Sequence, residues 1–277
     1  MVLRMPMIKD TTITVHKERS VYMIDLHCHI LPEVDDGADN LMKSIEMAEK
    51  AVDQGITHIL CTPHHNNGKY TNPKYFVISQ VEKLQIELDK RNIPLTLFEG
   101  QEVRITGTLI EEIKLDKILF TDISDKYILI EFPTIDIPSY TEQLFFELIT
   151  MNKVPIIVHP ERNAKFRENP NLLIPFLDMG CLAQLTAPSY VGVFGKSIQK
   201  TAKIMLENNL VQMIASDAHG VNKRNFYLKE AYEKLRKEFG EQKVLDFKDT
   251  AKKVINGDYI SLDNYTAYEE KKFKWFK

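Results

Sequence analysis

The segment IDLHCHILPEVDDG (residues 24–37) places two histidines one residue apart and follows them with two adjacent aspartates. Alternate side chains of an extended strand share a face, so His27 and His29 are expected to point together and Cys28 to the opposite side. A lone histidine on a strand is usually structural, but two imidazoles at a strand end are a typical metal-ligand pair. We therefore predict that His27 and His29 bind a metal ion and that Cys28 packs in the core.

Further imidazoles and carboxylates follow the later apolar runs of the chain. In TPHH only one of the two adjacent histidines can face a given site, and we prefer His64 to His65. The segment EGQEV offers Glu99 and Glu102. A carboxylate that ends an apolar run is costly unless a cation pairs with it, so Glu131 after YILI is a strong candidate. The last candidates end two further apolar runs: His159, Asp217 and His219.

Together these residues supply about eight nitrogen and oxygen ligands, too many for one tetrahedral ion and suited to two or three. No thiolate is required, and a mixed imidazole and carboxylate set suits manganese, iron or zinc. Arg162 and Arg224 occupy loops that leave two of these strands. Guanidinium groups bind phosphate bidentately, so metals beside two arginines indicate hydrolysis of a phosphate ester.

The elements that must position these residues alternate between short apolar runs and longer amphipathic segments. The expected strands are 23–27, 57–62, 94–100, 127–132, 155–159, 181–186 and 211–216, and the expected helices are 41–52, 77–88, 139–152, 170–179, 194–208 and 224–239. Such alternation predicts a parallel α/β fold. A barrel and an open sheet both fit, but only a barrel brings all the carboxyl ends of its strands to one mouth. No GxGxxG or Walker loop follows any strand, which disfavours a nucleotide-binding sheet.

The bulk properties exclude several other classes of protein. The chain has 277 residues, which fit one large domain, and its net charge of −3 disfavours a nucleic-acid-binding protein. Its three cysteines show no paired spacing, so neither a disulfide framework nor a zinc ribbon is expected and a cytoplasmic location is predicted. No run approaches the roughly 20 apolar residues of a membrane span. Residues 1–22 form an N-terminal extension of undefined role without a signal-peptide core.

At this point the ordered motifs MIDLHCHILPEVDDGA, TPHHNNGKY, GQEV, HPER and SDAHG resemble the polymerase and histidinol phosphatase (PHP) superfamily. More narrowly, they resemble the bacterial metal-dependent protein-tyrosine phosphatases encoded with capsule and exopolysaccharide genes. The motifs match in order from Met23 to about residue 225, and the resemblance implies a distorted (β/α)7 barrel. We expect the barrel domain to span residues 23–265 and residues 266–277 to form a C-terminal tail that ends in KKFKWFK. It also implies a manganese centre of two or three ions, an autophosphorylating tyrosine kinase as protein substrate, and allows a homo-oligomer.

The resemblance assigns the metal ligands to His27, His29, Asp35, His64, Glu102, Glu131, His159, Asp217 and His219. Asp36 is an alternative to Asp35. Catalytic roles fall to Arg162 and Arg224, which bind phosphate, and to His64. The implied mechanism is in-line attack by a hydroxide that bridges two metals. Cysteine-dependent phosphatases need an arginine six positions after the cysteine, whereas those positions hold Val34, Asn67 and Ala187.

Three other functions fit the same scaffold. A small-molecule phosphatase acting on histidinol phosphate would use the same metal site, as would a phosphodiesterase acting on nucleic acid. The near-neutral charge disfavours the nucleic-acid substrate. A non-catalytic PHP interaction module is disfavoured because such a domain is expected to lose several ligands, and this sequence retains them all.

Overall fold

The structure is a computed structural model that describes residues 22–222, 224–262 and 264–270 of the chain. Most of the predicted N-terminal extension and the KKFKWFK segment lie outside these residues. The alternation of strands and helices is as predicted, and every strand pairing among the described residues is parallel. The protein is therefore a mixed α/β protein with parallel sheets.

The strands are β1 Ile24–Cys28, β2 His58–Cys61, β3 His64–His65, β4 Thr96–Glu99, β5 Glu102–Arg104, β6 Tyr127–Glu131, β7 Val154–Val158, β8 Leu182–Thr186 and β9 Met213–Ala215. They form one sheet in the order β1-β2-β4 and a second in the order β3-β5-β6-β7-β8-β9. The sequence predicts one strand over 57–62 and one over 94–100. Each is instead followed, after a break at Pro63 or at Gly100 and Gln101, by a further short strand that carries a candidate ligand.

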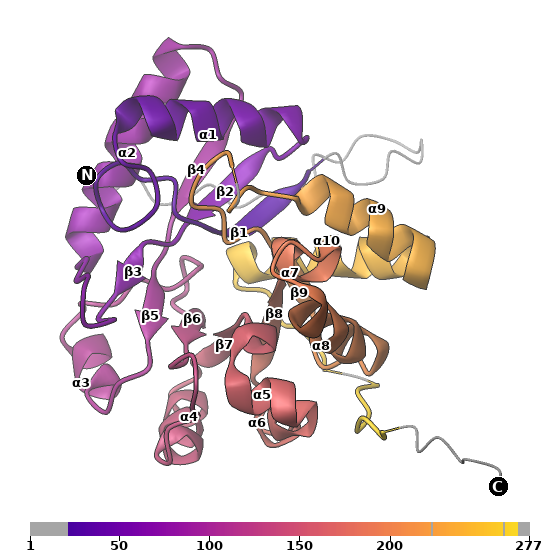
Figure 1. Cartoon of the computed structure of the whole chain (residues 1–277). Helices are drawn as coiled ribbons and strands as arrows, with labels where there is room; N and C mark the ends of the chain where they lie inside the picture. Colours follow the sequence, from indigo (N-terminus) through magenta and orange to yellow (C-terminus); the bar gives the residue numbers. More distant parts are fainter. Residues whose placement is uncertain (1–21, 223, 263, 271–277) are drawn as a thin grey trace, which may run out of the picture.

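The helices lie around the outside of the strands (Figure 1). They are α1 Leu41–Asp53, α2 Lys74–Lys90, α3 Leu109–Lys114, α4 Thr141–Thr150, α5 Ala164–Glu168, α6 Ile174–Asp178, α7 Ala187–Val191, α8 Lys196–Glu207, α9 Leu228–Phe239 and α10 Glu241–Asn256. The predicted helix over 170–179 is a 3₁₀ turn, Pro170–Leu173, followed by the short α6. Short helices such as α3 and α7 were not predicted because fewer than two turns give no clear apolar period. The longer α10 was also not predicted.

Apolar side chains on the two faces of the strands form two buried clusters, as β6 illustrates. Tyr127 and Leu129 belong to a cluster that also contains residues of α10. Ile128 and Ile130 belong to the larger cluster beneath the other helices. Strand side chains alternate between faces, so both faces of β6 are buried, as in parallel sheets covered by helices. Glu131 comes next on the face of Tyr127 and Leu129, so this face becomes polar at the carboxyl end of the strand.

The chain after α10 runs back along the body of the protein. Thr266 donates a backbone hydrogen bond to the Asn208 carbonyl at 3.0 Å. Tyr268 and Asn171 exchange two hydrogen bonds at 2.7 and 3.0 Å. The first described residues of the predicted tail therefore have fixed contacts. No helix among the described residues is long and apolar enough to cross a membrane.

Candidate metal and phosphate site

The predicted ligands gather where the strands end. His27 lies on β1, His64 on β3, Glu102 on β5 and Glu131 at the end of β6. His29, His159, Asp217 and His219 lie in the loops that follow β1, β7 and β9. All eight residues are buried, each with an exposed fraction of 9% or less. Residues that are up to 192 positions apart in the sequence (His27 to His219) thus meet at one end of the strands.

Their donor atoms form four overlapping groups, in each of which all the atoms lie within 4.8 Å of one another. The groups are His29, Asp36, His64 and His219; His27, His29 and Asp217; His27, Glu102 and His159; and His64, Glu102 and Glu131. Every predicted ligand except Asp35 appears in them, and Asp36 takes its place. Four residues, His27, His29, His64 and Glu102, each belong to two of these groups. Glu102 has two carboxylate oxygens, so it would have a donor for each of two neighbouring ions.

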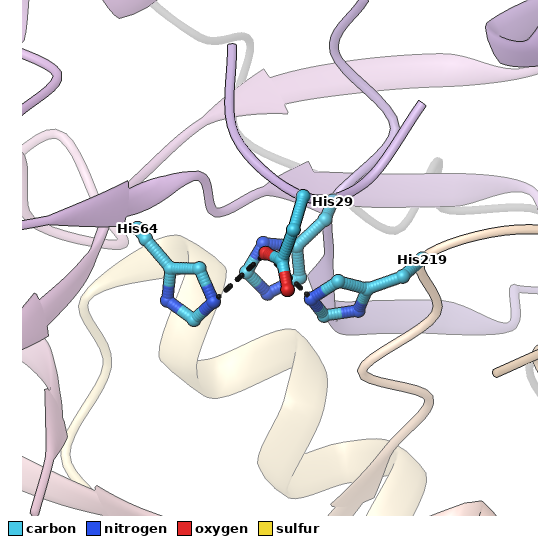
Figure 2. Close-up of side chains that lie close together, drawn as sticks. His29, His64 and His219 are labelled. Atoms are coloured by element: carbon cyan, nitrogen blue, oxygen red, sulfur yellow. Dashed lines mark ion pairs between the residues drawn. The ribbon is translucent and has the colours of Figure 1, made fainter. Parts of the chain in front are cut away.

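The two adjacent aspartates have different roles in this geometry. The side chain of Asp35 is 1% exposed. Its oxygens accept hydrogen bonds from His29 Nδ1 at 2.6 Å and from the backbone N–H groups of His64 and Gly37 at 3.0 and 2.9 Å. An Asp36 oxygen instead lies 3.2 Å from His64 Nε2 and 3.4 Å from His219 Nε2. Figure 2 shows the rings of His29, His64 and His219 around that carboxylate. The geometry therefore favours Asp36, the alternative considered beside Asp35, as the carboxylate that joins this donor group.

Gly37 explains why the chain can make this arrangement. A Cβ atom at position 37 would lie 2.0 Å from the His29 carbonyl oxygen, a distance that no side chain tolerates. The backbone of Gly37 thus passes directly over His29 and donates to Asp35. The same turn directs the neighbouring Asp36 side chain to His64 and His219. Two ligand candidates, His159 and Asp217, also have left-handed backbones with φ of 37° and 51°. Such conformations cluster at functional sites.

The donor set fits divalent cations because the lone pairs of several nitrogen and oxygen atoms converge, and too few N–H or O–H groups are present to form hydrogen bonds with all of them. His27 Nε2 lies 3.2 Å from His29 Nε2 and 3.4 Å from an Asp217 oxygen. His27 Nδ1 faces Gln184 Oε1 at 2.9 Å, which assigns its proton to Nδ1 and leaves the Nε2 lone pair facing the cluster. Four buried atoms of the cluster have no well-formed hydrogen bond to any residue that the structure describes: His64 Nδ1, Glu102 Oε2, Glu131 Oε2 and His219 Nε2. Metal ions satisfy such atoms without protons.

The ionisation of the site shows the same excess of negative charge. Burial lowers the pKa of His29, but the Asp35 carboxylate outweighs it and raises that pKa to about 9. Burial likewise opposes protonation of His64, yet Glu102 and other carboxylates raise its pKa to about 11. Burial and the neighbouring Glu102 raise the pKa of Glu131 to about 7. The cluster therefore retains protons that bound metal ions would displace.

Two arginines lie at the edge of the cluster, as predicted. Arg162 forms a short ion pair with Asp217, and Arg224 Nη2 lies 3.4 Å from the same carboxylate oxygen. Arg224 Nη1 also lies 3.3 Å from Asp36. Their side chains remain 27% and 33% exposed, so both guanidinium groups have donors that a ligand can reach. This is the arrangement expected of arginines that bind a phosphate next to metal ions.

Other candidates lie outside the cluster. His65 accepts a hydrogen bond from the Asn72 backbone, and Glu99 appears in none of the donor groups of the described residues. Cys28 is fully buried in the larger core cluster, and burial raises its pKa well above the ordinary value of a thiol. A nucleophilic thiolate at Cys28 is thus excluded on physical grounds. Gln184 was missed, although a glutamine inside the apolar run CLAQLT is a buried polar residue that needs a partner.

Comparison with known proteins supports a specific activity for this geometry. The family model described as "Capsular polysaccharide synthesis, CpsB/CapC" matches residues 23–256. The chain is 46% identical over 220 residues to the tyrosine-protein phosphatase YwqE of Bacillus subtilis, covering 79% of this chain and 86% of the relative. It is 39% identical over 255 residues to the putative tyrosine-protein phosphatase CapC of Staphylococcus aureus, covering 92% and 99%.

A solved structure gives the same result at the level of the fold. It is described as belonging to YwqE from Bacillus subtilis and CpsB from Streptococcus pneumoniae, "unique metal-dependent tyrosine phosphatases". The superposition has a TM-score of 0.86 and 42% sequence identity, and covers 90% of this chain and 100% of the other. The fold and most of the sequence are therefore shared with proteins described as metal-dependent phosphatases.

Proposed function

Because the chain belongs to the CpsB/CapC family of capsular polysaccharide synthesis, we infer that it is a metal-dependent tyrosine-protein phosphatase. The resemblance to capsule-associated phosphatases drawn from its motifs is thereby confirmed. One observation carries the function: nitrogen and oxygen donors from residues between His27 and His219 converge beside two arginines that remain partly exposed. A thiol-dependent mechanism has no support, because Cys28, Cys61 and Cys181 are all buried.

The residues proposed to hold the ions are the members of the four donor groups: His27, His29, Asp36, His64, Glu102, Glu131, His159, Asp217 and His219. Bound ions supply Lewis acidity toward phosphate oxygens and lower the pKa of water. Manganese is the metal we propose, because a thiolate-free set of imidazoles and carboxylates suits it, although iron and zinc accept the same donors. Metal analysis of the purified protein tests this assignment.

The two arginines and the residues around the histidines have further proposed roles. Arg162 and Arg224 are proposed to bind the non-bridging oxygens of the phosphate and to offset the charge that develops on them. Asp35 and Gln184 hold the rings of His29 and His27 through the nitrogens that face away from the cluster. His64, at the exposed side of the cluster, is proposed both as ligand and as a group that contacts the reacting phosphate. Tyrosine, with a pKa of about 10, leaves without obligatory help from an acid.

We also propose that the strands close into a distorted seven-stranded barrel formed by residues 23–265. The support is the order of pairing, in which β2 and β3 read as one interrupted strand and β4 and β5 as another. The open edge between β1 and β9 is bridged by a parallel pair, Cys28 and Ala218. In such a barrel all donor residues lie at the mouth where active sites occur.

The proposed substrate is the phosphorylated, tyrosine-rich tail of an autophosphorylating kinase of capsule synthesis, in keeping with the family. The test is release of phosphate from a phosphotyrosine peptide with Mn²⁺ and with chelator, with histidinol phosphate as the competing substrate. Arg162→Ala is expected to lower kcat/KM by roughly 10²–10³, the usual cost of removing one group that stabilises transition-state charge. Turnover that survives the chelator, or preference for histidinol phosphate, would contradict the proposal. A homo-oligomer also stays a prediction, which measurement of the molecular mass by sedimentation velocity tests.

A further inference from the structure

A pocket with a volume of about 480 Å³ lies beside the arginines and combines charged with apolar walls. Val193, Phe194 and Ile198 line it together with Arg162 and Arg224. The three apolar residues come from the loop between α7 and α8 and from the first turns of α8. Phe194 already contacts a guanidinium group, since the Arg162 Cζ atom lies 5.7 Å from its ring centre. The pocket therefore joins an aromatic wall to the proposed phosphate-binding groups.

The same arginines connect this pocket to the donor cluster on both sides. Arg162 also lines a neighbouring small cavity with two metal-ligand candidates, Glu131 and His159. Arg224 lines another with Asp36 and His219. A phosphate held between the two guanidinium groups would thus touch the metal cluster and leave its ester group next to the apolar wall.

The apolar wall has no part in the core. Val193, Phe194 and Ile198 are each half-buried. Among the described residues they are absent from both buried clusters and from the side chains packed against them, whereas the nearby Val191 packs against the larger cluster. Apolar side chains that line a pocket without supporting the core are typical of a surface that contacts a ligand.

Charge distinguishes this pocket from the other large one beside the site. Arg167, which is exposed at the surface, is the third arginine in its lining, and no carboxylate lines it among the described residues. The pocket on the far side of Arg224 is lined by the carboxylates Asp36, Asp39 and Glu46 together with Lys43 and Arg224. A dianionic phosphate ester on a peptide is therefore attracted more strongly to the pocket with three guanidinium groups and no carboxylate than to the pocket where three carboxylates oppose two cations.

We propose that this pocket binds the phenyl ring of phosphotyrosine, with Phe194 as the residue that determines specificity for aryl over alkyl phosphate esters. The inference rests on the proposed tyrosine phosphatase function and adds the surface that recognises the leaving group. The phosphate of phosphotyrosine stands one ring length further from the peptide backbone than that of phosphoserine. Only the aromatic side chain fills the space between the arginines and the peptide, where it packs against Phe194.

The test compares Phe194→Ala and Phe194→Leu with wild type in the manganese-loaded, full-length protein. Phe146→Ala is the matched control, because Phe146 is 62% exposed on α4 and lines none of these pockets. Calorimetry measures the affinities for phenylphosphonate and methylphosphonate, which share the phosphonate group and differ in the ring. We expect Phe194→Ala to weaken phenylphosphonate binding about tenfold and Phe194→Leu about threefold, since an aromatic contact contributes about 0.5–1.5 kcal/mol beyond its buried area. Methylphosphonate affinity stays within twofold of wild type.

Turnover provides the second measurement. Phe194→Ala is expected to raise KM for a phosphotyrosine peptide with a smaller change in kcat, whereas Phe146→Ala changes neither. Equal effects of Phe194→Ala on both phosphonates, or no effect on either, would overturn the assignment of this pocket. A wild-type protein that binds phenylphosphonate yet releases no phosphate from phosphotyrosine would instead overturn the proposed activity, so the two failures are distinguishable.

Discussion

Replacing Asp36 by Asn should remove a metal ligand without lowering the stability of the protein. The same change at Asp35 should lower the stability and leave the metal ligands in place. The two carboxylates are adjacent in sequence, but the side chain of Asp36 is 42% exposed and that of Asp35 is 1% exposed. Asp35 accepts three hydrogen bonds from His29, His64 and Gly37. Asp36 only faces His64 Nε2, His219 Nε2 and Arg224 at 3.2–3.4 Å. Each variant therefore serves as the control for the other.

The expected magnitudes follow from these contacts. A hydrogen bond to a charged group contributes about 1.5–3 kcal/mol, and Asn retains one acceptor oxygen, so Asp35→Asn should lower the free energy of unfolding by roughly 3 kcal/mol. For a chain of this size that corresponds to a fall in Tm of roughly 6–10 °C. Ion pairs as exposed as those of Asp36 contribute about 0–1 kcal/mol, so Asp36→Asn should change the Tm by at most about 3 °C.

The assay is thermal unfolding in chelator, followed by metal analysis after reloading with Mn²⁺. We expect Asp36→Asn to lose the ion held by His29, His64 and His219 while its metal-free Tm stays near that of wild type. We expect Asp35→Asn to unfold earlier and to bind the same number of ions about 10–100-fold more weakly, as when a residue behind a ligand is lost. The assignment of Asp36 as the ligand would be refuted if Asp35→Asn lost metal at an unchanged Tm while Asp36→Asn kept all its ions.

Three further predictions test the surroundings of the site. Gln184→Leu removes the acceptor of His27 Nδ1 and should weaken metal binding about 10–100-fold, measured by competition with a chelator; an affinity within twofold of wild type would show that other contacts hold the ring. In chelator, unfolding free energy should fall from pH 7 to 9, because Asp35, acting against burial, raises the pKa of His29 to about 9. The folded state then keeps a proton that the unfolded chain, with an ordinary pKa of about 6.5, has released, so this stability is complete below pH 6.5 and lost as pH rises through about 9. The slope is at most about 1.4 kcal/mol per pH unit for this proton, and denaturant titrations that give a flat profile there would contradict the cause. Cys28→Ser should keep most phosphatase activity, and near-total loss would mean that this buried thiol has a chemical role.

Local sequence spacing determined much of the site, because a strand fixes the directions of neighbouring side chains. Strand alternation predicted that His27 and His29 point together, and their Nε2 atoms indeed lie 3.2 Å apart, although His29 is the first residue after β1. The apolar runs likewise predicted the longer strands, since burial of both faces leaves a continuous apolar run in the sequence. The family followed from the order of the motifs.

Only the tertiary structure decided between residues whose local surroundings are alike. Asp36 rather than Asp35 faces His64 and His219 because Gly37 passes over His29, a contact that sequence periodicity does not encode. His159 and Asp217 turn into the cluster through left-handed backbones beyond the strand ends, where strand alternation no longer sets the direction of a side chain. Phe194 reads as an ordinary loop residue until Arg162 is placed beside it. The spacing of residues in the sequence sets the directions of side chains within one helix or strand. Contacts between distant elements decide which donor atoms face a metal ion and which apolar side chains line the pocket for a ligand.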